Sequence, residues 1–326
     1  MLISVVTISK NAKNTISKCF ESILSQTYPS IEVVVVDSSD DGTEEIIENY
    51  KQKSKFPFKI IRKEPKGVGA ARNEGISNAN GDVVVFVDSD CWISKNFINE
   101  IAKHYAKSDK VLCVRAKEGF DPPQGQGLFP LLVYLYDKIM GWSKIPEELK
   151  GVDPLMPRKK LYDIVGLYDE NLRAGEDTEL YNRVLKKLDE LKKQGYEFLY
   201  APKAVNHEEK QDIGFFRYYK KCIWYGEPLA NWRYFSSNLL GNTIKMFIII
   251  YFAALPIFLI VSVIAHINIT YIAISLIPFF LLYLYIILRS IIIEDFSRII
   301  FLMPILLFYK YIWLFVGFVK GIIKKV

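Results

Sequence analysis

Two carboxylates stand close together directly after a run rich in valine. Asp88, Ser89 and Asp90 follow residues 82–87, whose sequence DVVVFV is typical of a strand buried on both faces. Hard cations such as Mg²⁺ and Mn²⁺ prefer carboxylate oxygens, and a bound cation can neutralise a departing diphosphate. The motif predicts a Mg²⁺ or Mn²⁺ site with Asp90 as first ligand and Asp88 as second. An acidic turn that caps a following helix is the alternative.

A third carboxylate, Asp37, follows the β-branched run 31–36. It could accept the imide N–H of a uracil or guanine ring. The next polar residues, Asp40, Asp41 and Thr43, are interpreted as a turn and a helix N-cap. Asp37 is therefore the candidate for binding a nucleobase.

The segment 66–73, KGVGAARN, suggests a helix start that approaches a ligand. It is not a dinucleotide fingerprint, because Arg72 occupies the position of the third glycine. Its two glycines would let the backbone come close, with Arg72 and Lys66 near a phosphate or base. A solvated basic helix face is the alternative.

An acid pair opens the amphipathic helix predicted over 176–194. Asp177, with Glu176 beside it, is the candidate base for removing a proton from an acceptor hydroxyl. The helix dipole alone also favours acids in a first turn. His207, placed just past a predicted strand at 198–201, could complete the metal shell or contact the diphosphate. A structural histidine is the alternative there.

Alternating strands and helices must position these side chains. The periodicity predicts strands at 2–8, 31–36, 59–62 and 82–87, and helices at 15–26, 43–51 and 68–78. Such alternation indicates an α/β fold with a mostly parallel, doubly wound sheet and ligands at the carboxyl ends of its strands. Residues 111–160 are predicted to form loops around the site, with an apolar helix near 131–140.

The C-terminal third is predicted to enter a membrane. Residues 244–264 and 269–288 are each long enough to span a bilayer core, which takes about 20 apolar residues. Residues 299–319, interrupted by Pro304 and Lys310, are predicted as a third span or, with slight preference, an interfacial helix. Residues 215–235 suit a helix in the headgroup layer.

The placement of charge indicates which side of the membrane the chain occupies. Of the net charge of +6, most lies after residue 242, where seven Lys or Arg face two Asp or Glu. The nearly neutral remainder argues against a nucleic-acid partner. Basic residues flank both ends of the apolar hairpin, which predicts a multi-pass cell-membrane protein with its first part in the cytoplasm. Four scattered cysteines are interpreted as free thiols of a reducing compartment.

Taken in order, these motifs resemble the inverting family 2 glycosyltransferases, which have a GT-A fold. The matching stretches are 5–8 with Asn11, then 22–29, 32–43, 67–81, 88–90, and 175–177 with Arg183. The resemblance implies a UDP- or GDP-sugar donor, Asp37 at the base, Asp88 near ribose or metal, Asp90 on the metal and Asp177 as base. It also implies a donor site lined by Thr7, Ser9, Asp37, Lys66, Arg72, Asp88 and Ser89.

These inferences predict three regions. A GT-A domain would occupy residues 1–210, an amphipathic interfacial segment 211–242, and a membrane region 243–326. The predicted function is metal-dependent, inverting sugar transfer to a membrane-associated, lipid-linked glycan. One alternative is a polyprenyl-phosphate glycosyl synthase, whose acidic acceptor would need no Asp177. Another is a membrane scaffold with a degenerate, non-catalytic domain. No QxxRW-type motif of processive synthases follows His207, which favours addition of a single sugar.

Overall fold

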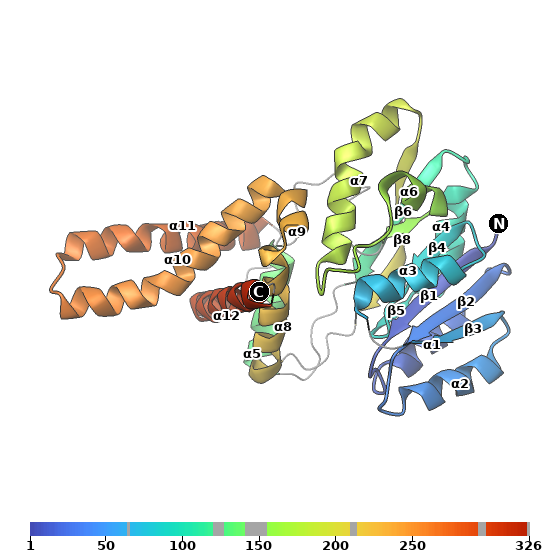
Figure 1. Cartoon of the computed structure of the whole chain (residues 1–326), viewed down its shortest axis with the longest axis horizontal. Coiled ribbons are helices and arrows are strands. Elements are labelled where there is room, and N and C mark those ends of the chain that lie inside the picture. The colour runs from blue at the N-terminus through green and yellow to red at the C-terminus, as the bar shows by residue number, and fades with distance from the viewer. Residues whose placement is uncertain (64–65, 120–126, 141–154, 209–213, 293–297, 325–326) are drawn as a thin grey trace. The chain divides into compact units, whose positions relative to one another are not determined.

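A computed structural model describes residues 1–63, 66–119, 127–140, 155–208, 214–292 and 298–324. The chain divides into two compact units (Figure 1). The first comprises Met1–Asp121 with Trp142–Lys210, and the second Pro122–Gly141 with Gln211–Val326. The predicted boundary at residue 210 and the predicted loop at 120–125 lie outside the described residues, so the three-region division stays a prediction.

A parallel four-stranded sheet with the order β3-β2-β1-β4 forms the centre of the first unit. Its strands and the helices between them are β1 (Ile3–Ser9), α1 (Ile16–Leu24), β2 (Ile31–Asp37), α2 (Thr43–Lys53), β3 (Phe58–Arg62), α3 (Val68–Asn78) and β4 (Val83–Phe86). The alternation predicted from the sequence is confirmed, because β1 pairs in parallel with both β2 and β4.

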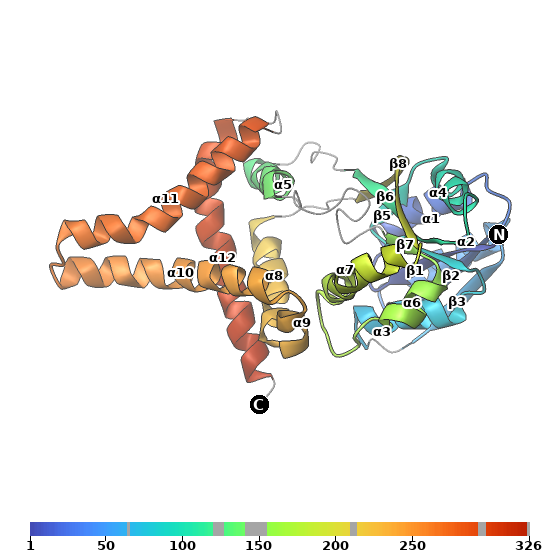
Figure 2. The ribbon, with the colours of Figure 1, turned by 90° about the horizontal axis from the view of Figure 1, so that it is seen from above.

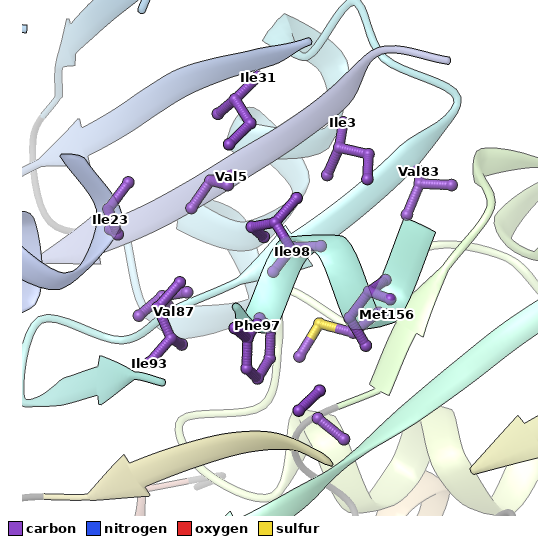
Figure 3. Close-up of a cluster of buried hydrophobic side chains, with 14 of the residues drawn as sticks. Ile3, Val5, Ile23, Ile31, Val83, Val87, Ile93, Phe97, Ile98 and Met156 are labelled. Carbon is purple, nitrogen blue, oxygen red and sulfur yellow. The ribbon is translucent and has the colours of Figure 1, made fainter. Parts of the chain in front are cut away.

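Burial on both faces explains the valine-rich strands. Every residue of β2 and of β4 is buried. Helix α1 turns Ile16, Cys19, Phe20 and Ile23 toward one side of the sheet, as its 3.6-residue period predicts. Figure 3 shows part of the resulting core, with side chains from strands and helices far apart in sequence, among them Ile3, Val5, Ile23, Ile31, Val83, Val87, Ile93, Phe97, Ile98 and Met156.

A second sheet, which the sequence analysis did not predict, has the order β5-β8-β6-β7. Its strands, with the helices of this part of the chain, are β5 (Cys91–Ile93), α4 (Phe97–Tyr105), β6 (Val111–Gly119), β7 (Leu155–Pro157), α6 (Lys159–Val165), α7 (Glu176–Lys193) and β8 (Glu197–Glu208). The sheet is mixed, because β5 pairs antiparallel with β8 and β7 pairs antiparallel with β6, while β6 and β8 pair in parallel. His207 therefore lies within β8, not past a short strand as predicted.

Helices make up the second unit. They are α5 (Leu128–Met140), α8 (Phe215–Gly226), η2 (Glu227–Ala230), α9 (Trp232–Ser237), α10 (Leu239–Ile264), α11 (Ile269–Ile292), η3 (Arg298–Leu302) and α12 (Met303–Ile323). The single interfacial helix predicted for 215–235 is broken into three pieces, with Pro228 in the middle one. Among the described residues, three stretches are long and apolar enough to cross a membrane: Leu239–Ile264, Ile269–Ile291 and Arg298–Ile323.

Two of these three helices form a hairpin, and the third crosses it. In both views α10 and α11 leave one turn as a hairpin, and Figure 2 shows α12 running across them toward the open end (Figures 1 and 2). Helix α12 packs tightly on α8, because a Cβ on Gly317 would lie 2.1 Å from the Ile223 carbonyl oxygen. A Cβ on Gly226 would likewise lie 2.2 Å from the Leu314 carbonyl oxygen. Glycine thus permits backbone contact between these helices.

Candidate active site

The carboxyl edge of the parallel sheet gathers the predicted donor-binding residues. Ser9 ends β1 and lies opposite Asp37, the last residue of β2. On the other side of β1, the Val87 amide bonds to the Val6 carbonyl oxygen, so Asp88 emerges from β4 at the same edge. Strand spacing of about 4.8 Å places the chains of β2 and β4 about 10 Å apart at this edge.

Asp37 is a buried carboxylate with two partners. Its side chain is 1% exposed. Its Oδ1 accepts a hydrogen bond from Ser39 Oγ at 2.7 Å, and its Oδ2 forms an ion pair with Arg62 at the end of β3. Arg62 is 40% exposed, so the pair opens to the surface. Nearby, the Ser9 hydroxyl is buried with no hydrogen-bond partner among the described residues.

Arg72 connects two acidic motifs that are far apart in sequence. From α3, its Nη1 donates to Glu176 Oε1 at 2.8 Å, and its Nη2 lies 3.4 Å from Asp88 Oδ2. The Arg72 side chain is 5% exposed and the Glu176 side chain 4%. The guanidinium also lies over the Tyr168 ring, 5.4 Å from its centre. Residues from α3, β4 and α7 therefore meet in one buried charge network.

Burial alters the protonation of Glu176. Desolvation raises the pKa of its carboxyl to about 7, and Arg72 opposes that rise while Asp177 and Asp88 add to it. One guanidinium shared between two carboxylates does not offset the loss of water around Glu176. A group with such a pKa changes charge near neutral pH.

Asp88 and Asp90 suit a hard cation. Asp88 Oδ1 is buried without a hydrogen-bond partner in the described part of the chain, whereas Asp90 is exposed two residues later. Across the residues that the structure describes, no three His, Cys, Asp or Glu side chains gather as a complete metal site. Mg²⁺ commonly uses only one or two carboxylates, together with water and substrate phosphates. These two carboxylates therefore fit the predicted cation.

His207 is held by stacking beside the turn of Asp88 to Asp90. It lies opposite Trp92 in the β5–β8 pairing, and the two rings stack at 5.3 Å with an interplanar angle of 6°. Lys18 Nζ lies 3.2 Å from the centre of the Trp92 ring. A Cβ on Gly119 would approach His207 Nδ1 to 2.5 Å, so glycine leaves room for the imidazole.

The remaining predicted residues are placed less centrally. Asp177 is half-buried beside Glu176, where its Oδ1 accepts from the Thr178 amide at 2.5 Å. Thr7 is fully buried in β1 beside the Cys19 thiol. Ser89 is half-buried in the turn, and Lys66 is exposed two residues before α3. The structure thus joins Glu176, not Asp177, to the Arg72 network.

Comparison with known proteins shows which proteins the chain is similar to. Residues 4–143 match the model of the family described as glycosyl transferase family 2. Over these residues the chain is similar to the glycosyltransferases of family 2. Glycosyltransferase GlyA of Streptococcus pneumoniae serotype 4 (strain ATCC BAA-334 / TIGR4) is 32% identical over 168 residues, covering 49% of this chain and 24% of the relative.

Two further relatives extend the comparison. The UDP-Glc:alpha-D-GlcNAc-diphosphoundecaprenol beta-1,3-glucosyltransferase WfaP of Escherichia coli is 37% identical over 112 residues, covering 34% of this chain and 43% of WfaP. The chain thus spans less than half the length of GlyA or WfaP. The mannosyltransferase PcManGT of Pyrobaculum calidifontis, solved with GDP-Man and Mn²⁺, superposes with a TM-score of 0.62 at 17% identity, over 99% of this chain and 88% of that protein. This likeness confirms the predicted GT-A fold with a helical C-terminal region.

Three side chains of this candidate site were not predicted from the sequence. Arg62 pairs with Asp37, Trp92 stacks on His207, and Tyr168 packs against Arg72. The position of Trp92, two residues after the acidic motif, could have drawn attention to it. Tyr168 had no local signal, because Asn73 bonds to its backbone across 95 residues of sequence.

Proposed function

We propose that the chain transfers a sugar from a nucleotide-sugar donor to an acceptor at a membrane, with inversion at the anomeric carbon. The observation that carries the proposal is the Arg72 network, which joins Asp88 of the DSD motif to Glu176 at the start of α7. It brings a cationic group for the diphosphate and the predicted catalytic acids to one edge of the sheet. The match to family 2 supports the same reaction class.

The donor would lie along the carboxyl edge of β1, β2 and β4. Asp37 would accept the imide N–H of the base, and the buried Ser9 hydroxyl would gain a partner in the donor. Asp90 and Asp88 would hold Mg²⁺ or Mn²⁺, with His207 close by. When bound, the cation would supply charge neutralisation for the leaving diphosphate. Thr7, Lys66 and Ser89 are proposed to support the donor more peripherally.

The chemical step is a single displacement. Asp177 would accept the proton of the acceptor hydroxyl as its oxygen bonds to the anomeric carbon. The bond from that carbon to the diphosphate breaks, and the electron pair leaves with the nucleoside diphosphate. Glu176 would hold Arg72 in position, because its Oε1 accepts a hydrogen bond from Arg72 Nη1 at 2.8 Å. Asp177, half-buried beside it, is better placed for an acceptor.

The proposed acceptor is a lipid-linked glycan at the cytoplasmic face of the cell membrane. The three long apolar stretches of the second unit support membrane association. The name of WfaP describes a UDP-glucose donor and a diphosphoundecaprenol-linked acceptor. The bilayer would keep enzyme and acceptor in one plane. Basic residues flanking the hairpin favour a cytoplasmic first unit.

Sugar transfer by the full chain in detergent tests the proposal. Labelled UDP- and GDP-sugars would be incubated with Mn²⁺ and a membrane lipid extract, using the unmodified chain, Asp88→Asn, and Asp109→Asn as an exposed control. We expect Asp88→Asn to lower transfer at least about 100-fold, the usual effect of losing one electrostatic group. Transfer by Asp88→Asn at the rate of Asp109→Asn would contradict the proposal.

A second substitution distinguishes the acceptor chemistry. With a hydroxyl acceptor, Asp177→Asn should remove the proton acceptor and lower turnover about 100-fold or more. With a lipid phosphate as nucleophile, which is already ionised, Asp177→Asn should leave turnover largely intact. The second result would replace the proposed glycan acceptor with a polyprenyl phosphate.

A further inference from the structure

Charge is scarce in the three long apolar helices of the second unit, and all of it is basic. Helices α10 and α11 each carry one cation, Lys245 and Arg289, while α12 carries Lys310 and Lys320. Their sequences contain no Asp or Glu. Charged side chains in such helices are rare and often mark ligand or ion sites. Each cation has to be matched by an acceptor outside these helices.

Lys320 has such an acceptor. Its Nζ lies 2.8 Å from Glu227 Oε1, and Lys324, just beyond α12, approaches the same oxygen to 3.1 Å. Lys245 and Lys310 differ from Lys320 and Lys324. Within the ranges that the structure describes, no carboxylate lies at ion-pair distance from Lys245 or Lys310. The basic end of α12 is neutralised within the unit, while Lys245 and Lys310 are not.

Helix α5 brings the cations of α11 and α12 together. Lys310 Nζ lies 3.9 Å from the centre of the Tyr136 ring, and the Tyr136 hydroxyl lies 3.2 Å from the Tyr311 hydroxyl. About one turn further along α5, the Ile139 carbonyl oxygen accepts from Arg289 Nη2 at 3.3 Å. Figure 2 shows α5 beside α12 and the end of α11.

Lys245 joins this group from α10, which packs against α12. The Lys245 and Lys310 side chains are both half-buried on these two packed helices, and the charge of Lys310 acts on Lys245. Repulsion between like charges grows as water is excluded. Asp137 is the sole acid in the sequence of α5, and it already has an interaction partner. An anion between the two lysines would convert repulsion into attraction.

The positions of Lys245 and Arg289 along their helices suit a lipid headgroup. Lys245 lies near the start of α10 and Arg289 near the end of α11, so both belong to the open end of the hairpin (Figure 2). Exposed apolar side chains lie on the same helices, such as Phe247 at 70% and Ile305 at 65%. A ligand with a phosphate and a hydrocarbon chain could satisfy both kinds of surface.

We propose that Lys245 and Lys310, with Arg289 of α11 as a further cation, bind the phosphate of a membrane lipid. Two ammonium groups offer mobile donors to several phosphate oxygens, and the nearby tyrosine hydroxyls can add another donor. The site belongs entirely to the second unit and does not depend on the donor site of the first. Its ligand is either the headgroup of an anionic phospholipid or a polyprenyl phosphate, which share this chemistry.

Lipid binding by the full chain in detergent, followed by native mass spectrometry, tests the site. Phosphatidylglycerol, a polyprenyl phosphate, phosphatidylcholine and inorganic phosphate would be titrated against the unmodified chain and the double variant Lys245→Gln with Lys310→Gln. Lys220→Gln, at an exposed position of α8, controls for lost charge at the surface. We expect the double variant to bind the preferred lipid about 25-fold more weakly, roughly fivefold for each lysine.

Each outcome decides the proposal. Lysine-dependent binding of polyprenyl phosphate above phosphatidylglycerol supports an acceptor-lipid site, and equal binding of the two supports a general headgroup site. The proposal is overturned if phosphatidylcholine binds equally well, if inorganic phosphate competes as effectively as either lipid, or if the double variant loses no more than Lys220→Gln. If the double variant fails to fold, Lys245→Gln and Lys310→Gln are measured singly; each should weaken binding about fivefold, and no loss in either overturns the proposal. Loss of sugar transfer would not affect this measurement.

Discussion

At the scale of single residues, Arg72 organises the proposed site. Its guanidinium contacts Glu176 and Asp88 at once, and it is almost completely buried. Burying three charges is costly unless each keeps good partners, so removing any one of them should disturb the other two. The resulting network makes the protonation of Glu176 a measurable property of the fold.

Glu176 should make stability depend on pH. Its pKa is about 7 in the folded chain against 4.5 as its ordinary value, so the folded state holds the proton more strongly. The contribution of Glu176 to the stability of the fold is then greatest below pH 4.5 and is lost as pH rises through 7. As pH rises from 5 to 8, the unmodified chain should therefore lose stability that Glu176→Gln keeps. We expect this difference in the free energy of unfolding to be on the order of 1–3 kcal/mol.

Thermal unfolding of both proteins in detergent at pH 5 and pH 8 measures this effect. Asp109→Asn, which removes an exposed carboxyl, serves as the control. Parallel pH profiles for Glu176→Gln and the unmodified chain would show that Glu176 does not titrate in this range.

At the scale of elements, close contact between α3 and the sheet sets the position of Arg72. A Cβ on Gly75 would lie 2.4 Å from Cγ1 of Val6, which is fully buried in β1. Gly75→Ala should therefore push α3 outward, with a loss of about 1–3 kcal/mol in stability. Donor binding should weaken with it, because Arg72 lies one turn earlier on the same helix.

Gly214→Ala is the matched control, since nothing lies within 4 Å of a Cβ at that position. Thermal unfolding and nucleotide titration would compare the two alanine variants. Equal melting temperatures for Gly75→Ala and Gly214→Ala would mean that α3 can accept the methyl group without moving.

Helices and strands were predicted well from the sequence where a single residue pattern dominated. Continuous β-branched runs identified β2 and β4 within about a residue, and the glycines at 67 and 69 marked the start of α3. The second sheet was missed because its strands break such rules. β7 has only three residues, and β8 contains Pro202 and shifts register against β6.

Contacts across long stretches of sequence were beyond prediction. Asp37, Asp88 and Arg72 could each be named from local context, yet the bond from Arg72 to Glu176 spans 104 residues. Nothing in the first turn of α7 indicates which of its two acids faces Arg72. Only the packing of α7 on the first unit's sheets distinguishes Glu176 from Asp177.

At the scale of the whole molecule, the membrane topology follows from the arrangement of α10, α11 and α12. If the hairpin spans the bilayer and α12 lies along its surface, the link after α10 faces outward and both chain ends face the cytoplasm. All four native cysteines are buried and give little background in thiol labelling. Single cysteines at exposed positions can therefore report each side.

Labelling of intact cells with an impermeant maleimide tests this topology. We expect His266→Cys to react from outside, and Ile323→Cys and Lys53→Cys to react only after the membrane is opened. His266 lies in the link between α10 and α11, and Ile323 ends α12. Labelling of Ile323→Cys from outside would instead make α12 a third span.

The central claim, that a nucleotide-sugar donor binds through a cation at Asp88 and Asp90, is tested most directly by nucleotide-dependent stabilisation. Melting temperatures of the full chain would be measured with UDP and GDP, each with and without Mn²⁺, and repeated for Asp90→Ala. A ligand at 100 times its Kd stabilises the fold by about 2.7 kcal/mol. We predict that one nucleotide raises the melting temperature only with Mn²⁺ and that Asp90→Ala abolishes the rise. No stabilisation by either nucleotide, or an equal rise in Asp90→Ala, would contradict the claim.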